Sequence, residues 1–295
     1  MSLLIVILNY RTPALTLNCL QSIAGVLDEA PGMRVVVVDN GSGDDSPRAI
    51  EDAIRINHWP WCELMELPQN LGFAAGNNRG FERLKTSDCE WVLVLNSDTI
   101  VLPGALRRSH EVMRADPRIG MMSCRLLNAD HSTQNCTRPF PSPIRMILCA
   151  LGLPWLLPRQ FGWADVYDVP VTMLNQKRDC DWIIGAYMFI RRASLEQVGG
   201  FDTDFFFYGE DIELCHRFRA AGWRVHYDPA AAIVHLGGGS ENLSRAAATG
   251  RELHMRQARY LVQRKCYGVF WEHTVRAADR LAAALRKLKA RLKGP

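Results

Sequence analysis

Trp91–Thr99 reads WVLVLNSDT, and we take this stretch as the centre of the fold. Its apolar residues run directly into Asn96, Ser97 and Asp98. A short apolar run that ends in polar residues is typical of a central buried strand that stops at the carboxyl edge of a sheet. Ligands of open α/β sheets bind at that edge. Two interpretations of Asp98 follow: it caps the next helix, or it holds a divalent cation beside a diphosphate.

The residues before this stretch alternate between apolar runs and helical segments. Helices are predicted from Pro13 to about Asp28 and from about Ser46, and strands at Leu3–Leu8, Arg34–Val38 and near Cys62–Leu67. Alternation at this spacing predicts an α/β fold with a mostly parallel central sheet and helices on both faces.

A glycine-rich segment, Asn70–Gly80 (NLGFAAGNNRG), precedes the central strand and enters a helix. Glycines let a backbone approach a diphosphate, and the first amides of a helix can donate hydrogen bonds to it. The segment matches neither GxGxxG nor GxxxxGK[ST], and the second pattern occurs nowhere in the chain. A nicotinamide dehydrogenase and a P-loop ATPase are therefore disfavoured.

The pattern loosens after Asp98. We expect a helix over Leu106–Ala115 and a strand over Gly120–Leu127. Residues 139–178 contain six prolines and the apolar cluster Ile147–Leu157, which is too short to span a bilayer. This region is either an insertion over the site that contacts an acceptor or a lipid, or a surface excursion with a small core of its own.

Trp182–Ile190 (WIIGAYMFI) predicts another buried strand. Its Gly185 and Ala186 suggest the close approach of a ligand, because a glycine inside a strand often marks such a point. Two interpretations of Trp182 stay open: it stacks on a sugar, or it packs in the core.

Two further stretches carry candidate chemical groups. Glu210 and Asp211 begin a helix that runs to Gly222, directly after the aromatic run Phe205–Tyr208. Helix capping explains one of these carboxylates. Two carboxylates beside an aromatic run suggest a partly desolvated site in which one of them acts as a general base. His235 ends the second of two short strands expected around Asp228-Pro229 and is either structural or a ligand of Mn or Mg beside a carboxylate.

Composition restricts the class of protein. The chain is 48% hydrophobic and 22% charged, which is ordinary for a globular protein. Its net charge of +4 is uneven: residues 276–295 hold seven Lys/Arg and one Asp, so they carry +6 and the rest carries 4 − 6 = −2. A broad basic face is therefore missing, and a nucleic-acid partner is not expected. Nine scattered cysteines without a CxxC pair fit a reducing cytoplasm and argue against a disulfide framework or a zinc site.

The C-terminal residues 276–293 predict an amphipathic helix. Leucines recur at helical spacing among Arg and Lys side chains, at Leu281, Leu285, Leu288 and Leu292. The pattern fits an interfacial helix on an anionic membrane surface, and equally a helix packed on the domain or on a second subunit.

Together these stretches resemble glycosyltransferase family 2 with the nucleotide-diphospho-sugar transferase (GT-A) fold, and among its members the bacterial rhamnosyltransferases. The resemblance runs from Leu4 to about Ser240. Its motifs, in chain order, are Asn9–Arg11, Val38–Ser42, the Asn70–Gly80 loop, Asn96–Asp98, Trp182 with Gly185-Ala186, Gly200–Asp202, and Tyr208–Asp211 with Arg217. It implies a GT-A domain over 1–240, with a nucleotide-binding half (1–100) and an acceptor and catalytic half (101–240), and a helical extension over 241–295.

The resemblance also implies roles for single residues. Asp98 and His235 would hold a divalent metal, Mg or Mn, and Asp211 would be the catalytic base with Glu210 beside it. Asp39 would accept a hydrogen bond from the pyrimidine ring. The expected nucleotide-binding residues are Asn9, Tyr10, Arg11, Asp39, Asn70, Gly72, Asn77, Asn96 and Ser97, and those for sugar or acceptor are Trp182, Gly185 and Ala186.

Two positions depart from the family pattern. Asn96 stands where the family usually has the first carboxylate of an Asp-x-Asp motif, so weaker metal affinity is expected. Asn77 stands where an arginine is common, so neutralisation of the diphosphate must come from another residue.

The implied function is inverting transfer of a sugar, with rhamnose expected, in cell-surface polysaccharide biosynthesis. The donor would be a dTDP- or UDP-sugar and the acceptor a glycan or polyprenyl-linked molecule, with the enzyme in the cytoplasm or peripheral on the inner face of the plasma membrane. The alternatives are a nucleotidyltransferase, disfavoured by the lone Arg11 between residues 3 and 20, and a non-catalytic sugar-nucleotide-binding protein, disfavoured by the retained Asp98, Asp211 and His235. Association between copies stays open.

Overall fold

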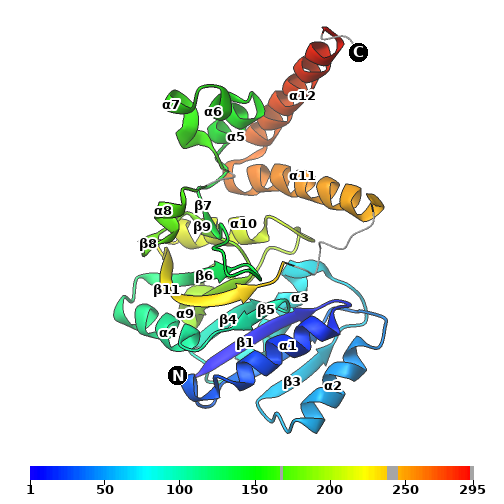
Figure 1. Cartoon of the computed structure of the whole chain (residues 1–295), viewed down its shortest axis with the longest axis vertical. Helices are drawn as coiled ribbons and strands as arrows, with labels where there is room; N and C mark the ends of the chain where they lie inside the picture. Colours follow the sequence, from blue (N-terminus) through cyan, green and yellow to red (C-terminus); the bar gives the residue numbers. More distant parts are fainter. Residues whose placement is uncertain (167–168, 238–244, 293–295) are drawn as a thin grey trace.

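The computed structural model describes residues 1–166, 169–237 and 245–292. A nine-stranded sheet forms its centre, in the order β3-β2-β1-β4-β10-β6-β11-β5 with β8 also paired to β11, and β7 and β9 form a separate two-stranded sheet (Figure 1). The strands are β1 (Leu3–Asn9), β2 (Arg34–Asp39), β3 (Cys62–Glu66), β4 (Trp91–Asn96), β5 (Thr99–Val101), β6 (Ile119–Leu127), β7 (Thr137–Arg138), β8 (Arg178–Asp179), β9 (Trp182–Ile183), β10 (Tyr187–Arg191) and β11 (Arg224–His235).

The described residues contain twelve α-helices. They are α1 (Pro13–Ala24), α2 (Ser46–Ile56), α3 (Gly72–Phe81), α4 (Ala105–Ala115), α5 (Pro143–Ala150), α6 (Leu153–Leu156), α7 (Pro158–Phe161), α8 (Val171–Leu174), α9 (Arg192–Val198), α10 (Glu210–Ala220), α11 (Arg245–Tyr267) and α12 (Val269–Leu292).

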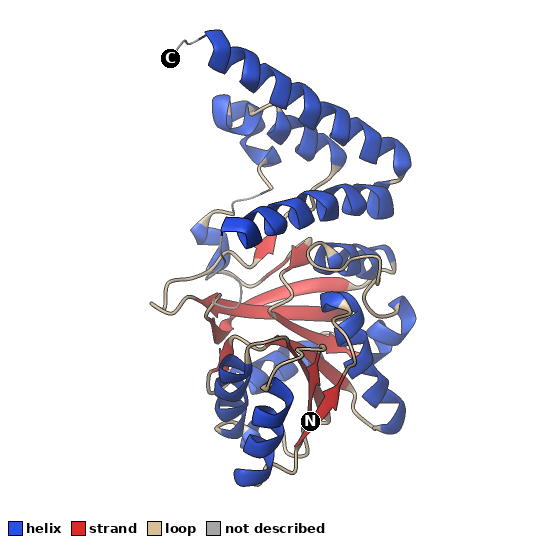
Figure 2. Cartoon of the chain, turned by 90° about the vertical axis from the view of Figure 1, so that its right-hand side faces the viewer, coloured by secondary structure: helices blue, strands red, loops and turns tan. Residues whose placement is uncertain are grey.

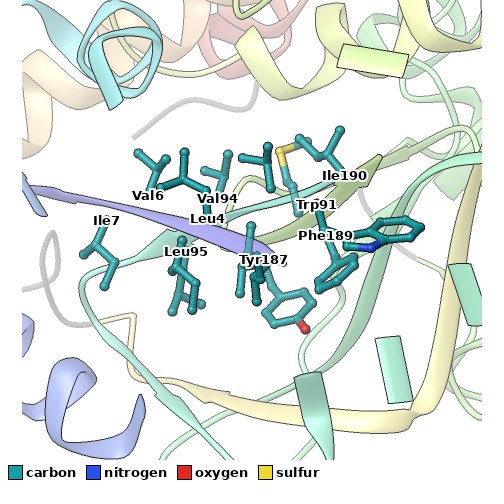
Figure 3. Packing of buried hydrophobic residues seen from close by; sticks show 14 of the residues in the cluster. Leu4, Val6, Ile7, Trp91, Val94, Leu95, Tyr187, Phe189 and Ile190 are labelled. Atoms are coloured by element: carbon teal, nitrogen blue, oxygen red, sulfur yellow. The ribbon is translucent and has the colours of Figure 1, made fainter. Parts of the chain in front are cut away.

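Strand β4 is central, as its apolar run predicts. It pairs in parallel with β1 and antiparallel with β10, so that Leu95 lies between Ile7 and Tyr187. Figure 3 shows Val6 and Val94 on one side of the sheet and Ile7 and Leu95 on the other. All are buried, and each such side chain contributes roughly 1.5–3 kcal/mol relative to an exposed one.

Helices cover both faces of this sheet. On one face α3 lies so close that a Cβ on Gly80 would be 2.4 Å from Val6 Cγ1. On the other, Ser109 of α4 forms a 2.9 Å hydrogen bond with the hydroxyl of buried Tyr187. β3, β2, β1 and β4 are parallel, whereas β10 and β5 introduce antiparallel pairs. The predicted α/β fold is confirmed, with a mixed second half.

The structure corrects three predicted elements. Helix α1 ends at Ala24, and a short 3₁₀ turn (Leu27–Glu29) replaces its last predicted turn. The single strand expected over Trp182–Ile190 is two strands in different sheets, because the chain leaves the ladder around Gly185. The two strands expected around Asp228-Pro229 are one strand, β11, with an irregularity between Asp228 and Ala232 that accommodates the proline.

The C-terminal helices and residues 143–166 form a lobe beyond the sheet (Figure 2), whereas α8 and β8 lie at β11. α5 packs against the first half of α12 around buried Met146, Cys149, Val166 and Val275. This region therefore has the small core of its own that one interpretation of the sequence expected. Later in α12, Leu281 and Leu285 are about half exposed, 54% and 51%.

Some predictions fall outside the described residues. The domain boundary at residue 240 and the end of the amphipathic segment at 293 are among them. Within the described ranges, no helix is long and apolar enough to cross a membrane. All nine cysteines are free in this structure, as their scattered spacing predicts.

Candidate active site

The carboxyl ends of three neighbouring strands lie at one edge of the sheet. β1 ends at Asn9, β2 at Asp39 and β4 at Asn96, and the register pairs Asn9 with Asp39 and Leu8 with Asn96. The polar side chains that follow these strands in sequence are therefore neighbours in space, at the edge where α/β sheets bind ligands.

Asp39 fixes the first two loops of this edge. Its Oδ1 accepts hydrogen bonds from Asn9 Nδ2 (2.7 Å) and Ser42 Oγ (2.6 Å), and its Oδ2 accepts one from the Ser42 amide (3.0 Å). Arg11, in a left-handed conformation, donates from its amide to Ser42 Oγ and from Nε to the Ser42 carbonyl. Asn9 and Asp39 are buried, whereas Tyr10 is exposed. In this structure Asp39 holds the loops, and a direct contact with a base stays a prediction.

Asn40 joins the second loop to the glycine-rich segment. Its amide nitrogen donates to Asn70 Oδ1 and the Gly72 carbonyl, and its Oδ1 accepts from the Leu71 amide at 3.0 Å. Gly72 has φ +81°, and a Cβ there would lie 2.4 Å from the Phe206 carbonyl oxygen. Our sequence reasoning placed Asn70 and Gly72 at the site but missed the bridging role of Asn40.

The two predicted metal ligands meet. His235 pairs with Thr99 in the β11–β5 ladder, which brings His235 Nε2 to 3.4 Å from Asp98 Oδ1. On the other side of the ring, Nδ1 lies 2.9 Å from Gln134 Oε1. Gln134 uses its Nε2 to donate to Asn128 Oδ1 and the His235 carbonyl, so its Oε1 must accept from His235 Nδ1–H. In the neutral imidazole the lone pair of Nε2 therefore faces Asp98, and Gln134 orients this ring through a contact that the sequence did not reveal.

Asp98 and His235 suit a divalent cation that also has phosphate oxygens of a substrate among its ligands. The described residues contain no group of three or more His, Cys, Asp or Glu side chains able to enclose a metal. Mg²⁺ commonly takes only one or two protein ligands and completes its shell with phosphate oxygens and water, and imidazole also binds Mn²⁺. Asn96 Nδ2 lies 3.4 Å from His235 Nε2, and Ser97 Oγ is 3.5 Å from Thr12 Oγ1. The pair Asp98 and His235 thus fits a metal that a diphosphate helps to hold.

Gly185 and Ala186 connect Asp211 to the same edge of the sheet, at Asn96. Asp211 Oδ2 accepts from the Gly185 amide (3.3 Å) and Asp211 Oδ1 from the Ile212 amide (2.8 Å). The next residue, Ala186, accepts the Asn96 amide through its carbonyl at 3.1 Å. Burial raises the pKa of Asp211 to about 6, against the opposing effect of these backbone hydrogen bonds. A carboxylate with such a pKa is suited to general-base catalysis near neutral pH.

Glu210 differs sharply from its neighbour. Its side chain is buried, and Oε2 has no hydrogen-bond partner among the described residues. Burial, with the charge of Asp211 beside it, raises the pKa of Glu210 well above its usual range. Burial therefore favours the protonated form of Glu210, whereas the Asp211 carboxylate is held by two backbone amides and is the better placed of the two to accept a proton.

Arg138 is a second residue that our sequence reasoning missed. The β7–β9 ladder pairs it with Trp182, and its guanidinium lies 5.8 Å from the centre of that ring. Its Nε is buried and has no hydrogen-bond partner in the described structure. Its positive charge acts to lower the pKa of Asp211 and so favours the ionised form of this carboxyl group. No motif or spacing indicated this residue.

Two predicted site residues lie in the core instead. Asn77 is 1% exposed and donates to the Phe73 carbonyl within its own helix, so this geometry does not support contact with a diphosphate. Trp182 is 7% exposed and donates from its indole nitrogen to the Pro139 carbonyl. The structure favours the core interpretation of Trp182.

Comparison with known proteins agrees with this geometry. Residues 2–259 match the family described as glycosyltransferase like family 2. The chain is 31% identical over 227 residues to the N-acetylglucosaminyl-diphospho-decaprenol L-rhamnosyltransferase of Mycobacterium tuberculosis, covering 74% of this chain and 68% of the relative. It is 46% identical over 67 residues to rhamnosyltransferase WbbL of Escherichia coli, covering 23% of this chain and 25% of WbbL.

A solved structure shows the same fold. It is the mannosyltransferase PcManGT from Pyrobaculum calidifontis in complex with GDP-Man and Mn²⁺, which superposes with a TM-score of 0.59 at 18% identity, over 98% of this chain and 79% of that one. The sheet edge, the residues gathered there and the family match lead to one conclusion. The chain belongs to glycosyltransferase family 2 and is a glycosyltransferase of the GT-A fold.

Proposed function

We propose that the enzyme moves rhamnose from a dTDP- or UDP-sugar to a polyprenyl-diphosphate-linked acceptor, with inversion at the anomeric carbon. The observation that carries the proposal is the convergence of Asp98, His235 and Asp211 on one sheet edge, through the 3.4 Å Asp98–His235 contact and the Gly185-Ala186 link. The choice of rhamnose and of a lipid-linked acceptor rests on the names of the relatives.

Asp211 accepts the proton of the acceptor hydroxyl. The freed oxygen forms a bond to the anomeric carbon while the bond from that carbon to the diphosphate breaks, and the nucleoside diphosphate leaves with the electron pair. A single displacement of this kind inverts the configuration. The Gly185 and Ile212 amides hold the carboxylate in place for it.

Charge on the departing diphosphate requires cations nearby. Asp98 and His235 would hold Mg²⁺ or Mn²⁺, which when bound stabilises negative charge on the diphosphate. Arg138 supplies a further positive charge from the β7–β9 ribbon, in place of the arginine that Asn77 replaces. Asn9, Tyr10 and Arg11, with the Asn40-bridged loops, form the nucleotide side of the site.

We place the reaction at the inner face of the plasma membrane, because the relative from M. tuberculosis is named for a decaprenol-linked substrate. In this proposal the body of the protein stays outside the bilayer. Part of the predicted amphipathic segment 276–293 is then available to the membrane, whereas Ala282 and the preceding Val275 pack within the lobe.

The experiment that tests the proposal is a donor panel followed by two substitutions. Thermal shift with dTDP-, UDP- and GDP-sugars, with Mg²⁺ or Mn²⁺ and with chelator, identifies the donor, because a ligand that binds the native state raises the melting temperature. D211N should then lower kcat by ~10²–10⁴-fold and leave donor binding intact. D98A should remove metal-dependent donor binding.

Three results would contradict the assignments. Parallel loss of donor binding in D211N would make Asp211 structural. Metal-dependent binding that survives in D98A would remove Asp98 from the metal site. Donor binding without turnover on any acceptor would favour the non-catalytic alternative.

A further inference from the structure

Exposed apolar side chains concentrate in the lobe. Of the seventeen large hydrophobic residues that are exposed in the described chain, six lie within residues 143–164. They are Ile144 (56%), Leu151 (37%), Trp155 (56%), Leu156 (72%), Leu157 (46%) and Trp163 (55%). A contiguous stretch this rich in exposed apolar surface marks an interaction site in most soluble proteins.

These side chains are not the ones that hold the lobe together. The inner face of α5 buries Met146 and Cys149 against Val275 of α12, with Val166 closing the cluster. The six exposed side chains lie outside this small core and face solvent. Figures 1 and 2 both show α5, α6 and α7 projecting with α12 away from the sheet, beyond α11.

Two stretches of the lobe carry charge of one sign. Residues 143–164 contain Arg145 and Arg159 and no Asp or Glu, and residues 280–292 contain five Lys/Arg and no acid. The Arg145 guanidinium lies 5.3 Å from the Trp163 ring centre, so the two side chains form a cation–π pair on this surface. Arg286 and Lys287 are exposed on α12.

We propose that this lobe docks on the surface of an anionic lipid bilayer, with the Trp155–Leu157 turn and Trp163 entering the headgroup region. Trp favours the boundary between headgroups and hydrocarbon, and leucines beside it add apolar area. Arg and Lys without acids attract anionic headgroups. The helices that carry the apolar residues are only four to eight residues long, so they lie in the interface and do not span it.

Docking in this way brings the catalytic edge to the bilayer. The chain leaves for the lobe after Arg138, which pairs with Trp182, and Trp182 lies three residues before Gly185, whose amide donates to Asp211. This consequence rests on the proposed function, in which the acceptor is lipid-linked. The docking itself does not, because it needs only the lobe and the lipid.

Vesicle cosedimentation tests the inference. Large unilamellar vesicles of phosphatidylcholine alone, or with one quarter phosphatidylglycerol, are mixed with the full chain and no substrate. Wild type should bind the phosphatidylglycerol vesicles, more weakly at high salt. W155S/L156S should bind at least ~10-fold more weakly, because two exposed apolar side chains no longer enter the bilayer. The matched control is I56S on α2, a residue 67% exposed outside the lobe, which should bind as wild type does.

A second variant guards against misfolding of the first. R286Q/K287Q on exposed α12 should lose most of the preference for phosphatidylglycerol and keep the wild-type melting temperature. The inference is overturned if wild type stays in the supernatant, or if W155S/L156S sediments like I56S. It is also overturned if light scattering shows a dimer that W155S/L156S makes monomeric without any vesicle binding. The vesicles contain no acceptor, so none of these outcomes depends on turnover.

Discussion

Asp211 determines how the enzyme responds to pH. Because burial raises its pKa to about 6, the carboxylate gains a proton as the pH falls through that value, and catalysis is lost with it. We expect kcat/KM to rise from pH 5 and to level off above pH 7. Steady-state kinetics between pH 5 and 9, with donor binding followed separately, measure this profile. A profile that stays flat from pH 9 down to pH 5 would exclude Asp211 as the base.

Substitution of Glu210 should change the free energy of unfolding and should change kcat little. Its pKa is raised in the folded state, so the unfolded chain loses this proton first, near its ordinary value of 4.5. The group therefore destabilises the fold increasingly as the pH rises above that value. E210Q should be more stable than wild type at pH 8 by ~1–2 kcal/mol, with the difference vanishing near pH 4.5.

Urea unfolding at both pH values measures this difference. Turnover of E210Q should stay within a few-fold of wild type. A loss of activity as large as that of D211N would instead give Glu210 an ionised role.

Arg138 should act on the diphosphate. R138Q removes a charged hydrogen-bond donor and should weaken binding of a nucleoside diphosphate, or raise the acceptor KM, by roughly 10–100-fold. Calorimetry with dTDP and UDP measures the contact of Arg138 with the diphosphate of the donor. Acceptor kinetics measure its contact with the diphosphate of the lipid-linked acceptor. R79Q, which changes an exposed arginine paired with Glu82, is the control. If only the pH midpoint of R138Q moves upward, Arg138 acts on Asp211 alone.

Site residues at the ends of predicted elements could be identified from the sequence, but the residues that contact them could not. Asp98 and His235 could be named because they follow or end a strand, and Asp211 because it begins a helix after an aromatic run, and the family resemblance supplied their roles. Gln134 and Arg138 could not, because each acts through a contact with a residue far along the chain, His235 or Trp182. Such contacts depend on the path of irregular segments, for which a sequence has no periodicity to read.

At the scale of elements, the loop after β2 depends on close backbone approach. Gly41 and Gly43 both have φ +66°, but a Cβ on Gly41 would lie 2.3 Å from the Gln69 carbonyl carbon, whereas nothing lies within 4 Å of Gly43. G43A should cost about 1–2 kcal/mol for its left-handed backbone alone. G41A should cost more and should abolish nucleotide binding, because the loop must separate from residues 69–70.

Thermal melts and dTDP titration of the two variants check this expectation. Equal behaviour of G41A and G43A would show that the close approach is not required. Both glycines have the same φ, so a larger effect of G41A reports the close approach to residues 69–70.

Predicted elements failed where tertiary contacts overrode local pattern. The apolar run Trp182–Ile190 has the periodicity of one strand, yet the Gly185 amide bonds to Asp211 and the run divides between two sheets. The opposite happened around Pro229, where a break was expected. There Asp228 accepts the Ala230 amide at 2.8 Å, and β11 continues past the irregularity.

At the scale of the whole molecule, Glu272 ties the two C-terminal helices together. It is buried and accepts from Arg264 of α11 and Arg276 of α12, and these arginines hold the pKa of Glu272 below its ordinary value although burial alone would raise it. E272Q should lower stability by roughly 1 kcal/mol, since both guanidinium groups reach solvent. It should also speed proteolysis near Gly268 and leave dTDP binding unchanged. Unaltered cleavage would mean that apolar packing alone fixes the helices.

The α/β fold was predictable from the sequence because its sheet obeys simple rules of alternation. The lobe was not, since residues 139–178 have no regular period and their small core depends on α12, more than a hundred residues away. The small core confirms one interpretation of that region, whereas contact with a lipid stays our proposal. One face of its helices builds the small core, and the other is the surface that we propose for lipid.

The pairing of Arg138 with Trp182 has an evolutionary consequence. The excursion that forms much of the lobe starts after Arg138 and finishes before Trp182, and these two residues face each other in one short ladder, although its last residues form β8 and pair with β11 of the main sheet. Residues 143–164 lie between these anchors and form no strand, so a change in their length leaves both ladders as they are. Grafting residues 143–164 between homologues should therefore exchange the surface that we propose for lipid and leave the donor half unchanged.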